Sequence, residues 1–135
     1  MAGFLTDSMN SKILDMVFGG SAYTPPATLY IGLSLGGASK FGIPTEPAGG
    51  GYARAPIANT LTNFPLSVGG TKSNAVSVTF PSPTGNWGTI ASLFLADAQV
   101  GGTVLAMADL TVPKSITTGN SPATVAVGAL FLSHS

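Results

Sequence analysis

One short run of the sequence has the residue types of a nucleophilic enzyme. Gly32–Gly36 reads Gly-Leu-Ser-Leu-Gly and matches the G-x-S-x-G nucleophile elbow, which places a serine on a sharp turn between a strand and a helix. Asp97 or Asp109 and then His134 follow in the chain order of that hydrolase class. However, a loop rich in glycine follows the run instead of a helix, and His134 is the penultimate residue, where chains usually fray. We therefore expect Ser34 to be no nucleophile and the protein not to be an enzyme.

Metal, cofactor and sugar sites lack the residues that they need. The chain has one histidine, no cysteine and five scattered acidic residues, so no cluster of metal ligands stands at close spacing. Trp87 is the only tryptophan, and we expect it to cover a sheet end or fill a core edge. Gly49–Gly51 leads into a strand-like run without the lysine and helix of a phosphate loop, so it predicts a tight turn. No cofactor is expected.

The charge content is unusually low and points to association. Only 7% of the residues are charged, against about 25% in an ordinary soluble domain. Five basic and five acidic residues cancel, so no long-range field attracts nucleic acid. The mean hydropathy is +0.42, yet the longest apolar stretches, such as Val125–Leu132, are far short of the ~20 residues of a membrane-spanning helix. We therefore expect no nucleic-acid partner, no membrane, and a homo-oligomer.

The first twelve residues carry no export signal. Met1–Lys12 lacks a basic leading region followed by a continuous apolar stretch. We expect the protein to stay in the cytoplasm of the cell that makes it until assembly.

One amphipathic helix is predicted at about residues 6–18. Thr6 is a suitable N-cap, and two glycines after Phe18 can end the helix. At 100° per residue, one apolar stripe is expected to dock on the rest of the domain, whereas an i, i+4 pair points elsewhere. The first stripe contains Met9, Ile13, Met16 and Val17, and the second contains Leu14 and Phe18. We take these six residues as the candidate interface, with Thr24–Pro26 as a stiff spacer after the helix.

The remainder of the chain predicts a mainly β domain. Apolar residues alternate from Leu29 to Leu35, and further short apolar runs are separated by segments rich in glycine and proline. These runs are Tyr52–Ile57, Ala75–Phe80, Thr89–Leu95, Thr103–Leu110 and Ala123–Leu132. Because no second helix is available for a parallel crossover, we expect an antiparallel β-sandwich or jelly roll over about residues 28–135. Residues 1–135 then form one domain.

The longest segment without predicted structure is Gly36–Gly51. Loops of more than about 12 to 15 residues are usually functional or disordered. We expect this loop to lie at an outer surface and to be ordered by a neighbouring copy.

Several segments of the chain together form a recognisable pattern. They lie in Leu5–Ser34, and continue in Gly50–Arg54, Gly69–Asn74, Thr79–Pro81 and Thr84–Ile90. The first of them contains Lys12, Leu14, Asp15, Phe18–Gly20 and Ala22–Tyr30. In these residues the chain resembles a family of short tailed-phage virion proteins, usually labelled tail-fibre-like; Asn63–Pro65 stands where such proteins carry an Asn-Trp-Pro-like turn. The resemblance implies a β-rich structural protein of the virion.

The position in the virion is a separate question. A fibre normally needs a shaft built from repeats, and this 13.4 kDa chain has none. A capsid decoration or cement protein, stabilising the shell as an oligomer, is therefore our first expectation. A tail-fibre or head-fibre component is the second, and a receptor-binding module the third. The expected partners are other copies, in a trimer by analogy with decoration proteins at three-fold positions, and the major capsid or tail proteins.

Overall fold

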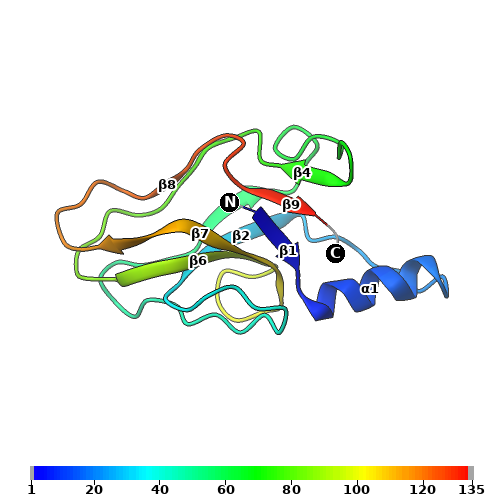
Figure 1. The fold of residues 1–135 in the computed structure, drawn as a ribbon, viewed down its shortest axis with the longest axis horizontal. Coiled ribbons are helices and arrows are strands. Elements are labelled where there is room, and N and C mark those ends of the chain that lie inside the picture. Colours follow the sequence, from blue (N-terminus) through cyan, green and yellow to red (C-terminus); the bar gives the residue numbers. More distant parts are fainter. Residues whose placement is uncertain (1, 134–135) are drawn as a thin grey trace.

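The computed structural model describes residues 2–133, which form a curled sheet with one helix projecting from it (Figure 1). The main sheet has seven strands in the order β3-β2-β6-β7-β1-β9-β4, and a second sheet pairs β5 with β8. The strands are β1 (Ala2–Leu5), β2 (Thr28–Ser34), β3 (Ala55–Ala58), β4 (Thr71–Ser73), β5 (Val78–Thr79), β6 (Gly88–Ala96), β7 (Val104–Ile116), β8 (Thr124–Val125) and β9 (Phe131–Ser133). The helix α1 spans Asp7–Val17.

The centre of the main sheet is formed by the most apolar strands. In β6, the five residues from Ser92 to Ala96 are all buried, and β2 and β7 pair with it on either side. Side chains of alternate residues point to opposite faces of a sheet. The main core accordingly contains Leu93 and Leu95, and a smaller cluster contains Phe94 and Ala96. The sheet is thus covered on both faces along β6.

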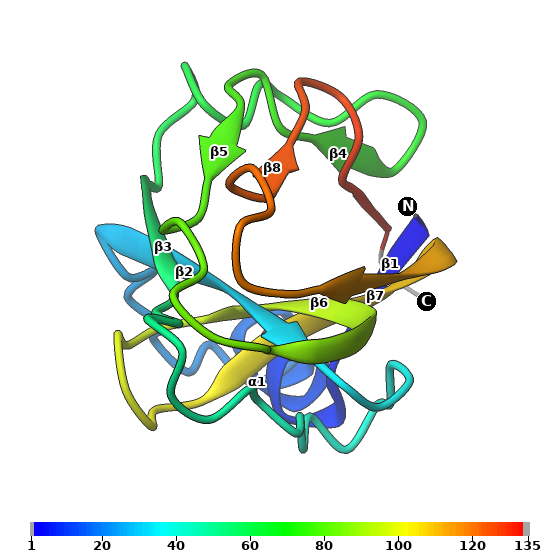
Figure 2. The same ribbon diagram turned by 90° about the vertical axis from the view of Figure 1, so that its left-hand side faces the viewer.

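The sheet curls into half of a barrel. Figure 2 shows β5 and β8 lying across from β6 and β7, with the inner space between them. Buried side chains from both sides meet there, including Phe80 next to β5, Val125 in β8 and Ile90 in β6. The short second sheet therefore closes part of the open side of the half-barrel.

The mainly β fold with one N-terminal helix is confirmed, whereas purely antiparallel pairing is wrong at one place. β1 and β9 run parallel, with Gly3 opposite Leu132. Parallel neighbours need a long connection, which we sought in a second helix. The connection is instead nearly the whole chain, because β1 and β9 lie at its two ends. The expected sandwich is also unequal, since its second sheet has two strands.

Within residues 2–133, no helix is long and apolar enough to span a membrane.

Candidate interaction surface

Thr6 fixes the start of α1 against the sheet. Its buried hydroxyl accepts a hydrogen bond from the Met9 amide at 3.4 Å and donates one to the Val104 carbonyl at 2.7 Å. At the other end, the Phe18 amide donates to the Leu14 carbonyl. The sequence-based helix at residues 6–18 is therefore confirmed, including its N-cap.

The helix rests on the domain through its first two turns alone. Met9 packs on the main core and Ile13 is half-buried, as expected for the first stripe. Met16 and Val17 are 42% and 59% exposed, so their expected docking on the domain is wrong. The reason is the direction of α1, which runs away from β1 and β9, so that its last turns have no strand beneath them (Figure 1).

The second stripe is exposed as predicted. Leu14 is 51% and Phe18 80% exposed. Together with Met16 and Val17 these residues form an apolar end of the helix, which we call the α1 tip. An exposed apolar patch on a small protein usually marks an interface. The geometry thus makes the α1 tip accessible to a partner.

An apolar groove lies beside the same helix. A cavity of about 370 Å³ separates Met9 and Ile13 of α1 from Leu95 and Leu132 of the sheet, and Pro25 of the spacer borders it. A second cavity of about 350 Å³ shares several of these residues and extends the groove to Phe64. The spacer is held near the helix because the Lys12 ammonium lies 5.3 Å from the centre of the Tyr23 ring. We call the two cavities together the α1 groove.

Ser34 has a structural environment. It is buried at the end of β2, and its Oγ accepts hydrogen bonds from the amides of Gly36 at 3.2 Å and Thr45 at 3.0 Å. Asp97 accepts from the Thr103 amide and Asp109 from the Ala38 amide, both at 2.7 Å, so both aspartates cap loop amides. His134 lies outside the described residues. Ser34 and the two aspartates are therefore engaged with backbone amides and do not form a triad with each other.

An ion pair that the sequence did not predict holds the long loop. Arg54, which is 6% exposed, donates from Nε to Oε1 and from Nη2 to Oε2 of Glu46, both at 2.9 Å. Its Nη1 donates to the carbonyls of Ala98 at 2.7 Å and Gly101 at 2.8 Å. One guanidinium thus connects the loop containing Glu46 with the β6–β7 loop. No motif signals this pair, because its partners are eight residues apart in an irregular segment.

The electrostatics of this cluster favour its charged form. The hydrogen bond from Arg54 holds the pKa of Glu46 below its ordinary value of 4.5, against an opposing effect of burial. The same hydrogen bond raises the pKa of Arg54. Burial raises the pKa of Tyr52, whose hydroxyl donates to Glu46 at 2.7 Å and accepts from the Leu33 amide at 3.0 Å. All three groups therefore keep their charge state at neutral pH, and their hydrogen bonds hold the loop containing Glu46 to the rest of the domain.

The loop Gly36–Gly51 is fastened within the chain at further points. The Leu35 amide donates to the Thr45 carbonyl, and the Asp7 amide donates to the Lys40 carbonyl, both at 2.8 Å. These bonds join the loop to the residue that follows β2 and to the start of α1. Ordering of the loop by a neighbouring copy remains a prediction, but the loop also has these anchors of its own.

Trp87 fills the end of the half-barrel, as predicted. It is buried, its ring lies edge-on to Tyr52 with centroids 5.3 Å apart, and its Nε1 donates to the Gly50 carbonyl at 2.7 Å. Gly50 has φ +63°, and a Cβ there would lie 2.9 Å from the Trp87 ring. The Gly49–Gly51 turn is thus a close approach of backbone to an aromatic ring. Among residues 2–133 there is no group of three or more side chains placed to hold a metal ion.

A comparison with protein families shows which family the chain belongs to. The family described as Podophage GP4 fiber I protein gp80 matches residues 5–133 of the chain. The chain belongs to this family. The family description indicates a structural component of a phage virion, which confirms the resemblance found in the sequence. A search of the curated proteins finds no match.

The family match covers α1 and every strand from β2 to β9. It does not assign a role to any residue. The six candidate interface residues keep their predicted role as a hypothesis, with Leu14, Met16, Val17 and Phe18 in the α1 tip and Met9 and Ile13 lining the α1 groove.

Proposed function

We propose that the chain is a non-enzymatic component of a phage fibre and that it is held in the virion through α1. The observation that carries the proposal is the family match over residues 5–133, combined with a helix that leaves its apolar end exposed. A structural component has to present surfaces that bind other proteins. The α1 tip and the adjoining α1 groove are such surfaces.

The partners that we propose are other copies of the chain and further virion proteins, such as the major capsid or tail proteins. Four large apolar side chains at one helix end are costly in water and gain free energy when covered, at roughly 25 cal/mol per Å² of apolar surface. The α1 groove, next to that end, offers an apolar lining of matching character. A homo-oligomer is therefore proposed. The trimer stays an analogy that the fold neither supports nor opposes.

A capsid decoration protein is the second candidate. It is favoured by one feature, which is that the strands curl into a half-barrel and build no repeated shaft. The fibre assignment is favoured by the family description. The number of copies in purified particles separates the two, measured by mass spectrometry relative to the major capsid protein. A fibre component is expected at a small fraction of that protein, whereas a similar number of copies would contradict the fibre assignment.

The role of α1 is tested by the double variant Leu14→Ser/Phe18→Ser. Both side chains are exposed, so the domain should stay folded while the α1 tip loses its apolar surface. We expect a lower mass in light scattering and loss of retention on particles. The matched control is Leu66→Ser/Val68→Ser, which removes two similarly exposed apolar side chains from a loop. If the α1 variant stays oligomeric and particle-bound, α1 is not the attachment element.

A further inference from the structure

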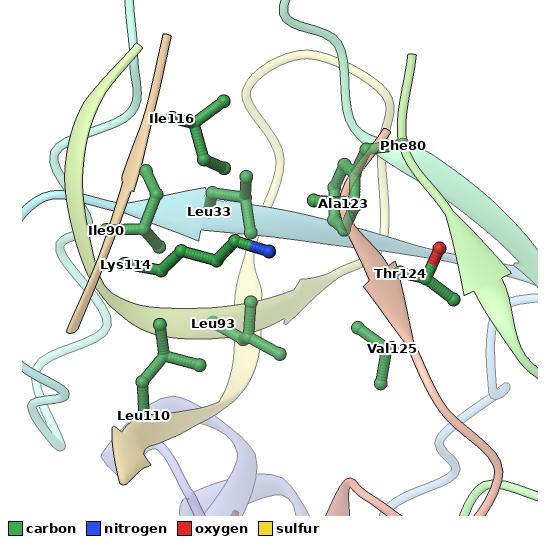
Figure 3. Close-up of a pocket in the computed structure, with 10 residues that line it drawn as sticks. All are labelled: Leu33, Phe80, Ile90, Leu93, Leu110, Lys114, Ile116, Ala123, Thr124 and Val125. Atoms are coloured by element: carbon green, nitrogen blue, oxygen red, sulfur yellow. The ribbon is translucent and has the colours of Figure 1, made fainter. Parts of the chain in front are cut away.

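A second apolar pocket lies inside the half-barrel, away from α1. It has a volume of about 90 Å³ and is lined by side chains from β2, β6, β7 and β8 and by residues next to β5 and β8 (Figure 3). Its lining residues are Leu33, Phe80, Ile90, Leu93, Leu110, Lys114, Ile116, Ala123, Thr124 and Val125. Apolar cavities of about 150 Å³ stay dry and bind benzene. This pocket is smaller and open on one side, so it fits a short apolar group that enters from the surface.

The lysine in this lining stands in register with buried apolar residues. Lys114 stands directly opposite Ile90 in the β6–β7 ladder, and Gly88 stands opposite Ile116. Directly opposed residues point to the same face of a sheet, as do residues two apart in one strand. Ile90 and Ile116 are both buried in the main core. Lys114 therefore starts on the core side of the sheet, but the residue as a whole is exposed, so its side chain lies at the open rim of the pocket.

An irregularity in β7 produces this arrangement. Between Ile90 and Ser92 of β6 there is one residue, whereas between their partners Lys114 and Asp109 there are four. Such bulges bend a strand and re-aim its side chains, and they are enriched next to functional sites. Leu110 and Lys114, at the two ends of the bulge, both line the pocket.

The charge of Lys114 has no counterpart in the part of the chain that the structure describes. The single ion pair found there joins Arg54 and Glu46, and no hydrogen bond is found for the Lys114 ammonium. Figure 3 shows the Lys114 side chain extending across the pocket, with its nitrogen between the apolar side chains of Leu33 and Leu93 in this view. A cation beside an apolar cavity is complementary to a molecule with an anionic head and a short apolar tail.

We propose that the pocket binds a small amphipathic anion, with the tail against Leu33, Leu93 and Val125 and the carboxylate or similar head on Lys114. This site is separate from the α1 tip and the α1 groove, so it does not depend on how the chain is attached in the virion. Each added methylene group strengthens binding by about fourfold until the tail fills the pocket. The head adds about a tenfold preference over a neutral molecule of the same length.

The test is an NMR titration of the methyl-labelled full chain with pentanoate, pentanol and pentylammonium. We expect saturable shifts of the Leu33, Leu93, Leu110 and Val125 methyl groups with pentanoate, and binding of pentylammonium weaker by more than tenfold. Propanoate should bind more weakly than pentanoate.

Variants separate the head from the tail. Lys114→Met should weaken pentanoate binding by about tenfold and leave pentanol unchanged. The matched control Lys40→Met, which changes an exposed lysine outside the pocket, should keep wild-type affinity for both. Ala123→Leu should block the binding of both pentanoate and pentanol, because the larger side chain fills the cavity. The proposal is overturned if millimolar pentanoate produces no saturable methyl shifts, or if Lys114→Met and wild type bind pentanoate equally.

Discussion

At the scale of single residues, the G-x-S-x-G run has structural reasons for two of its small residues, Gly32 and Ser34. Gly32 lies opposite Phe94, and a Cβ at this position would overlap the Phe94 ring. Ser34 satisfies two amides at the point where β2 ends and the loop begins. A short motif of this kind therefore arises from strand packing alone, and its catalytic meaning depends on the helix that is absent after it.

Replacing Ser34 by alanine tests this explanation. The variant leaves the amides of Gly36 and Thr45 without an acceptor, which costs about 1 to 3 kcal/mol of stability. Hydrolysis of short acyl esters should be at background for both proteins. The exposed Ser73→Ala serves as control and should have wild-type stability. Ester turnover that depends on Ser34 would contradict a structural role.

The Glu46–Arg54 pair makes a second prediction at this scale. Because the pKa of Glu46 is lowered in the fold, its contribution to stability is complete above the unfolded value near 4.5 and is lost as pH falls through the lower folded value. Glu46→Gln should lower the free energy of unfolding by about 2 kcal/mol at pH 7, since Arg54 loses its partner while buried.

The measurement is urea unfolding between pH 7 and pH 3. The difference in the free energy of unfolding between wild type and Glu46→Gln should become smaller below about pH 4.5. The control is Asp15→Asn, at an exposed position of α1. Its free energy of unfolding should change with pH in the same way as that of wild type. If the difference between wild type and Glu46→Gln does not change with pH, the ion pair is not its cause.

At the scale of elements, local patterns predicted α1, β2, β6 and most of β7, because each has a clear cap or apolar periodicity. The short strands β1 and β4 were missed. β4 consists of Thr71, Lys72 and Ser73, which carry no apolar pattern, and it exists because its backbone pairs with β9. Pairings of this kind join distant parts of the chain, so no local window of sequence contains them.

The candidate surface was predicted in part for the same reason. Helical periodicity identified the exposed stripe of Leu14 and Phe18, since the angle around a helix follows from residue spacing. It could not show that α1 extends past the sheet and exposes Met16 and Val17 as well. The α1 groove depends on where the spacer and β9 come to lie, which is a tertiary property.

The cap of α1 gives a prediction at this scale. Thr6→Val keeps the size of the side chain but removes the hydroxyl that accepts from Met9 and donates to Val104. Loss of an N-cap costs about 1 kcal/mol and up to about 2, measured here by chemical unfolding. Ser8→Ala, an exposed change in the first turn, is the control. Equal stability of the two variants would show that the cap does not hold α1 in place.

At the scale of the whole molecule, the low charge of the chain and the exposed α1 tip have one explanation. A fibre component is in contact with other proteins in the assembled particle. Its surface therefore needs few charged residues to keep it soluble. The 7% of charged residues and the apolar helix end both fit a subunit that is covered in the particle. The fold supplies a half-barrel from which α1 projects (Figure 1).

The most direct test of this account is immunogold electron microscopy of purified particles with an antibody against the chain. The account predicts gold at the fibres of the virion. Label spread evenly over the capsid would contradict the fibre assignment and favour decoration, and particles without any label would contradict a structural role in the virion.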